Sequence, residues 1–207
     1  MKVHVAGIDE AGRGPLAGPV VVAAVILNPA RRIRGLADSK VLKREERERL
    51  APTIRERALA FSIIAVEAGD IDRVNILQAT MIGMTRAALS LSTIPGMVLI
   101  DGNRVPADMC FPSRAIVKGD ATEPCISAAS ILAKTYRDAL MTEWDAHYPG
   151  YGFAQHFGYP TPEHLQRLRS MGPCPLHRRS FAPVRDCMQS GLFGDSAGLT
   201  FSTLPQS

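Results

Sequence analysis

Two adjacent acidic residues, Asp9 and Glu10, close an apolar run near the start of the chain, and a glycine-flanked arginine follows. The two carboxylates offer the hard oxygen ligands that divalent cations prefer. Arg13, between Gly12 and Gly14, offers a guanidinium and backbone N–H groups that suit a phosphate. The pattern indicates metal-dependent chemistry on a phosphodiester. Its alternative is an ordinary polar turn, because Asp, Glu and Gly are also common in loops.

Two more aspartates follow apolar runs further along the chain. Asp101 comes directly after 97–100, and Asp120 follows 115–117 through a short Lys-Gly link. Open α/β sheets bind ligands beyond the carboxyl ends of their strands, so neighbouring strands would bring these acids to one edge. Their repulsion would be relieved by Mg²⁺ or Mn²⁺. The sequence therefore predicts one carboxylate cluster made of Asp9, Glu10, Asp101 and Asp120.

This cluster raises a geometric difficulty at its first two members. Adjacent residues of a regular strand point to opposite faces, so Asp9 and Glu10 cannot both reach one cation from an undistorted strand. We therefore expect a bend at Glu10, before Ala11. In the alternative interpretation, Asp101 and Asp120 only end strands beside turn glycines, a common use of aspartate.

The composition is that of one ordinary globular domain. The 207 residues are 46% hydrophobic and 21% charged, which is typical of soluble proteins. The apolar run 20–27 is too short to cross a bilayer, and the first residues lack the apolar core of a secretory signal. We expect a cytoplasmic protein with no membrane partner, and a monomer by default.

The four cysteines are widely separated and form neither a CxxC pair nor a dense disulfide pattern, so reduced thiols are expected. Cys174 and His177 have the spacing of half a zinc site, but no second half follows.

The net charge of +4 favours an acidic partner. Five arginines gather in a C-terminal stretch with few acids and are candidates for contacts with backbone phosphates; a solvated basic helix and tail is the alternative. They are Arg167, Arg169, Arg178, Arg179 and Arg185.

Hydrophobic periodicity and turn residues predict a sheet packed against helices, an α/β sandwich. Strands are expected at 3–8, 20–27, 61–66, 97–100 and 115–117. Helices are expected at 42–59 with an interruption near Pro52, from about 75 to 91, at 127–140 with Lys134 and Arg137 facing outward, and at 161–170 with Thr161 as N-cap. The segment 12–17 matches the dinucleotide motif GxGxxA, but a strand rather than a helix follows it.

Longer stretches of the chain resemble the ribonuclease HII family, the type 2 ribonucleases H of bacteria. The matching segments are GIDEAGRGPLAGPVVVAAVIL, Asp38-Ser39-Lys40, NILQATMIGM, LIDGN, IVKGDA, SAASILAKTYRD, YPGYGFAQHFGYPTPEHL and HRRSFAPVR. The resemblance implies a ribonuclease H-like fold, with a mixed central sheet flanked by helices and a C-terminal helical extension. We expect one catalytic domain over 1–190. The segment 191–207 is rich in Ser, Gly and Thr and is expected to be a mobile tail.

The resemblance also implies an activity and a set of site residues. Such enzymes cut the RNA strand of RNA–DNA hybrids, leaving 5′-phosphate and 3′-hydroxyl ends, and incise 5′ to single ribonucleotides embedded in DNA. Carried over by motif, the metal-binding carboxylates are Asp9, Glu10, Asp101 and Asp120, and the substrate-binding residues are Gly12, Arg13, Gly14, Lys40 and Tyr159.

The expected mechanism uses two divalent ions, Mg²⁺ or Mn²⁺, about 4 Å apart, one activating water and one stabilising the leaving oxygen. Selectivity for RNA would come from the 2′-hydroxyl, with Tyr159 testing the sugar by shape unless it is packing only. Two alternatives remain: a nuclease of the same broad fold that acts on DNA alone, and a non-enzymatic nucleic-acid-binding module with structural acids. No protein partner can be assigned.

Overall fold

The computed structural model describes residues 3–36 and 42–193 of the chain. Its centre is a five-stranded mixed sheet in the order β3-β2-β1-β4-β5. The strands are β1 (Val5–Ala11), β2 (Val20–Ile26), β3 (Ala60–Val66), β4 (Met97–Asp101) and β5 (Ser113–Ile116). Strands β1, β2 and β3 pair antiparallel, whereas β4 runs parallel to both β1 and β5. The mixed α/β architecture expected from the sequence is confirmed.

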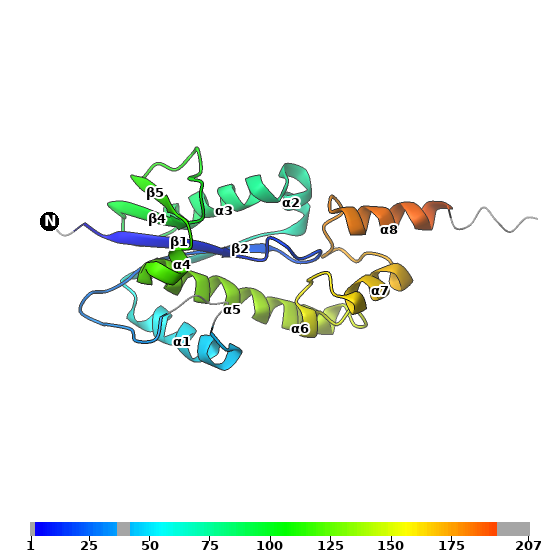
Figure 1. Ribbon diagram of the computed structural model, residues 1–207, viewed down its shortest axis with the longest axis horizontal. Helices are drawn as coiled ribbons and strands as arrows, with labels where there is room; N and C mark the ends of the chain where they lie inside the picture. The colour runs from blue at the N-terminus through cyan, green and yellow to red at the C-terminus, as the bar shows by residue number, and fades with distance from the viewer. Residues whose placement is uncertain (1–2, 37–41, 194–207) are drawn as a thin grey trace, which may run out of the picture.

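Helices cover both faces of this sheet (Figure 1). One face carries α1 (Arg44–Arg57) and α5 (Pro124–His147), and the other carries α2 (Ala68–Val74) and α3 (Ile76–Leu89). The short α4 (Gly119–Thr122) precedes α5. Beyond one end of the sheet lie α6 (Phe153–His156), α7 (Pro162–Met171) and α8 (Ala182–Phe193), which form the C-terminal helical part.

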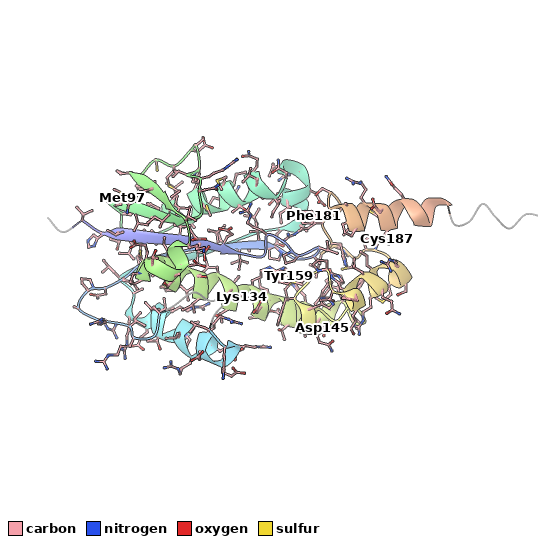
Figure 2. The ribbon with its side chains drawn as sticks, viewed as in Figure 1. Met97, Lys134, Asp145, Tyr159, Phe181 and Cys187 are labelled. Carbon is pink, nitrogen blue, oxygen red and sulfur yellow. The ribbon has the colours of Figure 1, made fainter. Side chains whose placement is uncertain are left out.

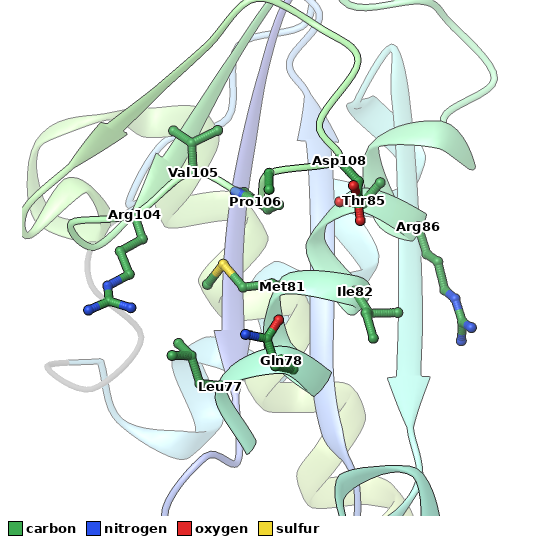
Figure 3. A pocket seen from close by; sticks show the side chains of 11 residues that line it. Leu77, Gln78, Met81, Ile82, Thr85, Arg86, Arg104, Val105, Pro106 and Asp108 are labelled. Atoms are coloured by element: carbon green, nitrogen blue, oxygen red, sulfur yellow. The ribbon is translucent and has the colours of Figure 1, made fainter. Parts of the chain in front are cut away.

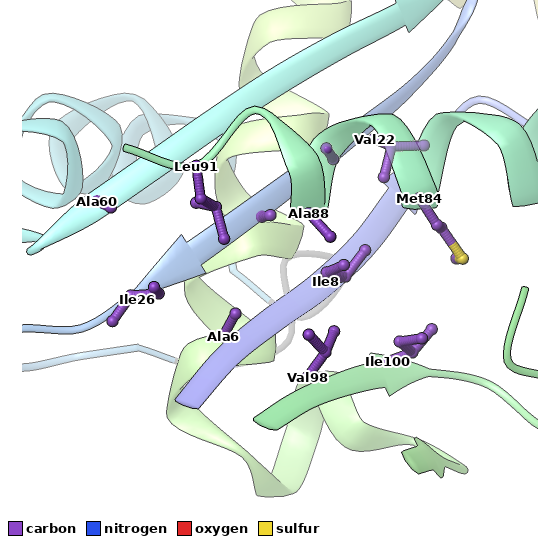
Figure 4. Close-up of a cluster of buried hydrophobic side chains, with 12 residues drawn as sticks. Ala6, Ile8, Val22, Ile26, Ala60, Met84, Ala88, Leu91, Val98 and Ile100 are labelled. Carbon is purple, nitrogen blue, oxygen red and sulfur yellow. The ribbon is translucent and has the colours of Figure 1, made fainter. Parts of the chain in front are cut away.

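Two hydrophobic layers hold the sheet between its helices. Ala6 and Ile8 of β1 pack with Val98, Ile100 and Met84 on the α3 side (Figure 4). The opposite layer consists of alternate residues of β2 with apolar residues of α1 and α5. Strand β2 is therefore buried on both faces, which explains why it reads as an unbroken apolar run.

The contact between β1 and α5 is close because Gly7 has no side chain. A Cβ at Gly7 would lie 2.2 Å from the backbone carbon of Cys125 at the start of α5. Substitution there would push α5 off the sheet and disturb the edge at which the acidic residues gather.

Three expectations about the elements need correction. Helix α1 continues through Pro52 without interruption: the proline removes one backbone donor, but the buried Leu50 and Ile54 keep the helix packed on the core. Helix α5 extends well beyond 127–140. Helix α8 was not predicted, and it runs into the segment 191–207 that we expected to be a tail; residues 194–207 lie outside the described part of the chain.

No helix in residues 3–36 and 42–193 is both long and apolar enough to cross a membrane.

Candidate metal centre

Three aspartates converge at one edge of the sheet. Carboxylate oxygens of Asp9, Asp101 and Asp120 all lie within 4.8 Å of one another. Asp9 and Asp120 are buried, at 2% and 4% exposure, and Asp101 is partly exposed. Buried carboxylates this close together repel strongly unless they share protons or bind a cation. The group has the hard oxygen donors and the spacing of a divalent-cation site.

The strand order explains why these three residues meet. The parallel pairing of β1 with β4 ends at Ile8 and Ile100, so Asp9 and Asp101 come immediately after the last pair. Strand β5 is the next parallel neighbour, and the chain leaving it turns into α4, which contains Asp120. The backbone N–H of Asp120 lies 3.4 Å from Oδ1 of Asp101, linking the two segments. Asp9, Asp101 and Asp120 thus converge as expected, although Asp9 lies within β1 and Asp120 lies in α4 rather than at the end of a strand.

Glu10 does not join this group in the way we expected. The predicted bend is absent, since Glu10 and Ala11 continue the regular pairing of β1 with β2. Asp9 and Glu10 therefore point to opposite faces of the strand. The Glu10 side chain lies on the α3 side, where it lines a cavity of about 350 Å³ together with Asp101, Met84 and other residues. Glu10 and Asp101 thus face one cavity, although Glu10 stands outside the three-aspartate cluster.

The electrostatics of Asp9 fit an ion-binding role. Burial raises the pKa of Asp9 well above its ordinary value, and the neighbouring carboxylates of Glu10 and Asp101 raise it further. The backbone N–H of Glu10 donates to Oδ1 of Asp9 at 2.7 Å, which fixes the orientation of the carboxylate. A divalent cation between the aspartates would offset both the burial of the charge and the repulsion that raise this pKa, so the donor set, its burial and its charge all suit a bound metal ion.

The loop between β1 and β2 is held by two buried arginines. Arg178 donates to the carbonyl oxygens of Gly12 at 2.6 Å, Arg13 at 3.0 Å and Gly18 at 2.9 Å. Arg137 of α5 donates to three further carbonyl oxygens, those of Pro19, Phe157 and Ala17, at 2.9 to 3.0 Å. Burial lowers the pKa of Arg178 to about 9 and that of Arg137 to about 10, which leaves both guanidiniums charged at neutral pH.

Sequence reasoning missed these two roles. The sequence makes Arg178 a candidate for phosphate contact, yet it is 0% exposed and, in the contacts described, binds only inside the protein. Arg137 was expected to face outward from its helix, but it is 1% exposed. A fully buried arginine is rare, and its targets are backbone carbonyls that leave no trace in the sequence. Nothing in residue type or spacing separates such an arginine from a surface one.

The arginine of the glycine loop itself remains accessible. The Arg13 side chain is 49% exposed, and its guanidinium lies 3.4 Å from Oε1 of Glu10. Gly12 adopts a φ of +94°, and a Cβ there would lie 2.0 Å from Nε of Arg137. Only glycine therefore fits at this position of the loop, against the Arg137 side chain. The loop thus holds Arg13 at the mouth of the acidic cavity.

Tyr159 lies beside this loop, as its placement among the expected substrate-binding residues requires. A Cβ on Gly14 would be 3.8 Å from the Tyr159 ring, and Tyr159 is 40% exposed. Nζ of Lys134 lies 5.8 Å from the centre of the same ring (Figure 2). Lys40, the remaining expected contact, lies outside the described residues.

The groove at the acidic cavity continues along α3. A second cavity of about 380 Å³ shares Leu77, Met81 and Arg104 with the first (Figure 3). Arg104 and Arg86 extend on either side of it. Asp101 and Glu10 therefore share their cavity with the cationic side chains of Arg13 and Arg104, a distribution that suits a polyanion whose reacting group is brought to a metal.

All four cysteines are free thiols, as expected. Sγ of Cys174 lies 3.2 Å from Nδ1 of His177, but no further ligand joins them within the described ranges, where the three aspartates are the candidate metal group found.

Comparison with known proteins agrees with the metal-binding site inferred from the geometry. The family model described as ribonuclease HII matches residues 6–184. A protein of Azoarcus sp. (strain BH72) named ribonuclease HII is 60% identical over 186 residues, which cover 90% of this chain and 91% of that protein.

Solved structures agree with the fold. Ribonuclease H2 from Pyrococcus horikoshii OT3 superposes with a TM-score of 0.77 at 26% identity, covering 89% of this chain and 97% of that one. Bst-RNase HIII, solved in complex with Mn²⁺, superposes with a TM-score of 0.71 at 20% identity, covering 90% of this chain and 70% of that one.

Proposed function

The chain belongs to the ribonuclease HII family of metal-dependent endoribonucleases, which cleave the RNA strand of RNA–DNA hybrids, and from this premise we propose a sharper activity. The protein incises duplex DNA on the 5′ side of a single embedded ribonucleotide, leaving 5′-phosphate and 3′-hydroxyl ends. Two divalent ions serve the reaction. The observation that carries the proposal is the position of three clustered aspartates beside a clamped glycine loop and a tyrosine that lies against it.

The aspartate cluster supports the metal requirement. Asp9, Asp101 and Asp120 would hold one ion, and Glu10, which shares a cavity with Asp101, extends the donor set for a second. When bound, such ions lower the pKa of water for attack on phosphorus and stabilise the leaving 3′-oxygen. Mg²⁺ and Mn²⁺ both suit carboxylate oxygens, and Bst-RNase HIII was solved with Mn²⁺.

The protein's own groups orient the substrate. The guanidinium of Arg13 at the mouth of the acidic cavity binds a backbone phosphate next to the scissile bond. Because Arg178 occupies the carbonyl oxygens of Gly12 and Arg13, the loop keeps one shape and presents its peptide groups to the ribose. Gly14 lets the sugar approach closely, since it has no Cβ.

Tyr159 supplies the shape test. Its ring is partly exposed and lies against Gly14, so a sugar placed on the loop would stack on it. A ribonucleotide placed in this way exposes its 2′-hydroxyl to the loop's peptide groups. This hydroxyl is the feature of the sugar that separates it from a deoxyribonucleotide. Long hybrids offer many such hydroxyls, whereas an embedded ribonucleotide offers one, so embedded substrates depend most on this fit.

The test compares three labelled duplexes of one sequence: all DNA, DNA with one ribonucleotide, and DNA paired with an RNA strand. Each is incubated with the wild type and with Asp101→Asn, in Mg²⁺, Mn²⁺ or chelator. The proposal expects metal-dependent cutting of the second and third duplexes, none of the first, and none by the variant. Equal cutting of all three would indicate a general nuclease, and tight binding without cutting would indicate a binding module.

A further inference from the structure

Three buried histidines pack next to the segment that carries Tyr159, and none of them belongs to the three-aspartate cluster. His156, His164 and His177 are 7%, 0% and 1% exposed. The rings of His156 and His164 stack at 4.3 Å between centroids, and His164 touches His177 through their Nε2 atoms at 3.1 Å.

Their hydrogen bonds fix where each proton sits. The backbone N–H of Cys174 donates to Nδ1 of His177 at 3.1 Å, so this nitrogen is an acceptor and the His177 proton is on Nε2. That proton is donated to Nε2 of His164. The His164 proton is then on Nδ1, where it is donated to the carbonyl oxygen of Tyr159 at 2.9 Å. The same proton positions result whether the network is followed from the Cys174 N–H or from the Tyr159 carbonyl, so the network is self-consistent.

The last acceptor ties this network to the proposed substrate loop. The carbonyl oxygen of Tyr159 accepts from the backbone N–H of Thr161 at 2.8 Å as well as from His164, so both of its lone pairs are engaged. His156 fixes the Phe157–Gly158 peptide, because its Nδ1 accepts from the N–H of Gly158 at 3.1 Å and its Nε2 contacts the carbonyl oxygen of Tyr151 at 2.8 Å. Two histidines thus hold the backbone on either side of the Tyr159 side chain.

We propose that His164 and His177 are positioning residues for ribonucleotide selection, acting through a hydrogen-bond chain with fixed tautomers that sets the place of Tyr159. The inference rests on the proposed contact between Tyr159 and the sugar. His164 delivers the hydrogen bond to the Tyr159 carbonyl, and His177 fixes the tautomer that allows His164 to donate in that direction. An aliphatic residue would fill the same space but could not orient the peptide.

A pair of substitutions at one site separates this role from packing. In His164→Asn the amide nitrogen falls near the place of Nδ1 and keeps a donor for Tyr159. In His164→Gln the amide reaches toward the place of Nε2, so contact with His177 is kept and the donor to Tyr159 is lost. His147, an exposed histidine of α5, receives the same two substitutions as a control.

The readout is kcat/KM on the single-ribonucleotide duplex divided by kcat/KM on the long hybrid. His164→Gln should lower this ratio by roughly 10- to 100-fold, the size of effect that a misplaced binding group produces, whereas His164→Asn should stay close to the wild type. In a Tyr159→Ala background, His164→Gln should have no further effect on the ratio. Long-range ¹H–¹⁵N NMR spectra should independently show His164 protonated on Nδ1 and His177 on Nε2.

Equal ratios for the two His164 variants, an additional loss in the Tyr159→Ala background, or an Nε2 proton on His164 would each overturn the histidine chain. These results differ from a failure of the proposed function. A wild type that does not cut the single-ribonucleotide duplex would refute that function and the positioning role with it, whereas wild-type selectivity that no His164 variant changes would refute the positioning role alone.

Discussion

Replacement of Asp9 by asparagine should make the metal-free protein more stable and inactive at once. The carboxylate oxygens of Asp9 lie within 4.8 Å of those of Asp101 and Asp120. Two unit charges at that distance repel by roughly 3.5 kcal/mol at an effective dielectric constant of about 20. The asparagine oxygen can still accept the hydrogen bond from the N–H of Glu10, so the substitution removes the charge and keeps the local geometry.

The raised pKa of Asp9 sets the sign of this effect. Above the ordinary pKa of 3.8, the unfolded chain carries Asp9 ionised, while the folded protein retains more of its proton, so stability falls as pH rises. Protonation and screening relieve part of the repulsion. We therefore expect Asp9→Asn to raise the free energy of unfolding by about the repulsion of one carboxylate pair, roughly 3 kcal/mol at neutral pH. For a protein of this size that gain corresponds to about 6–12 °C in Tm.

The assay is denaturant unfolding in chelator and in Mg²⁺, with Asp108→Asn as a control that removes an exposed acid from a loop. Wild-type protein should gain stability in Mg²⁺ because the ion binds the folded state, while Asp9→Asn should gain little. A variant that is less stable than the wild type in chelator would refute the claim that charge repulsion dominates this cluster. Unchanged activity would refute the assignment of Asp9 as a ligand.

Four further predictions follow from the surrounding structure. Arg137→Met should lower the free energy of unfolding by roughly 3 kcal/mol or more, since buried carbonyl oxygens lose their donor; an unchanged denaturation midpoint would contradict the clamp. Burial lowers the pKa of His164 and His177 to about 4, so stability should be full above pH 6.5 and fall by up to about 1.4 kcal/mol per pH unit and per histidine as pH drops toward 4; double substitution by non-titrating residues should flatten that slope in a pH series of unfolding curves. Arg13→Ala should raise KM on a single-ribonucleotide duplex while thermal stability and metal binding persist, and unchanged kinetics would exclude the phosphate contact. Tyr159→Ala should reduce cutting at embedded ribonucleotides more than cutting of long hybrids, whereas equal losses would indicate a packing role.

The aspartate cluster was predictable because it depends on simple strand geometry. Apolar runs followed by Asp101 and Asp120 are local patterns, and parallel neighbours place such residues together. The same geometry made the expected bend at Glu10 unnecessary: β1 stays regular and sends Asp9 and Glu10 to opposite faces, with the cavity on the α3 side still shared by Glu10 and Asp101.

The supporting residues were not predictable, because their partners are backbone atoms distant in sequence. Arg178 reaches carbonyl oxygens more than 150 positions earlier, and His164 and His177, 13 positions apart, meet through the packing of α7 against the turn that follows it. Residue type suggested a surface charge in the first case; in the second it suggested only half of a zinc site at Cys174 and His177 and gave no role for His164. Such roles arise from tertiary contacts, where the chain as a whole rather than local propensity decides burial.

The most direct test of the proposed activity is the position and chemistry of the cut in a DNA duplex with one ribonucleotide, resolved to the nucleotide. If the aspartate cluster holds metal ions that would activate water, a single incision 5′ to the ribonucleotide is expected, with a 3′-hydroxyl on one product and a 5′-phosphate on the other, only when Mg²⁺ or Mn²⁺ is present. A 2′,3′-cyclic phosphate end would show that the 2′-hydroxyl is the nucleophile and would contradict the role assigned to the cluster. A cut on the 3′ side that leaves a 3′-hydroxyl and a 5′-phosphate would contradict the proposed position of incision.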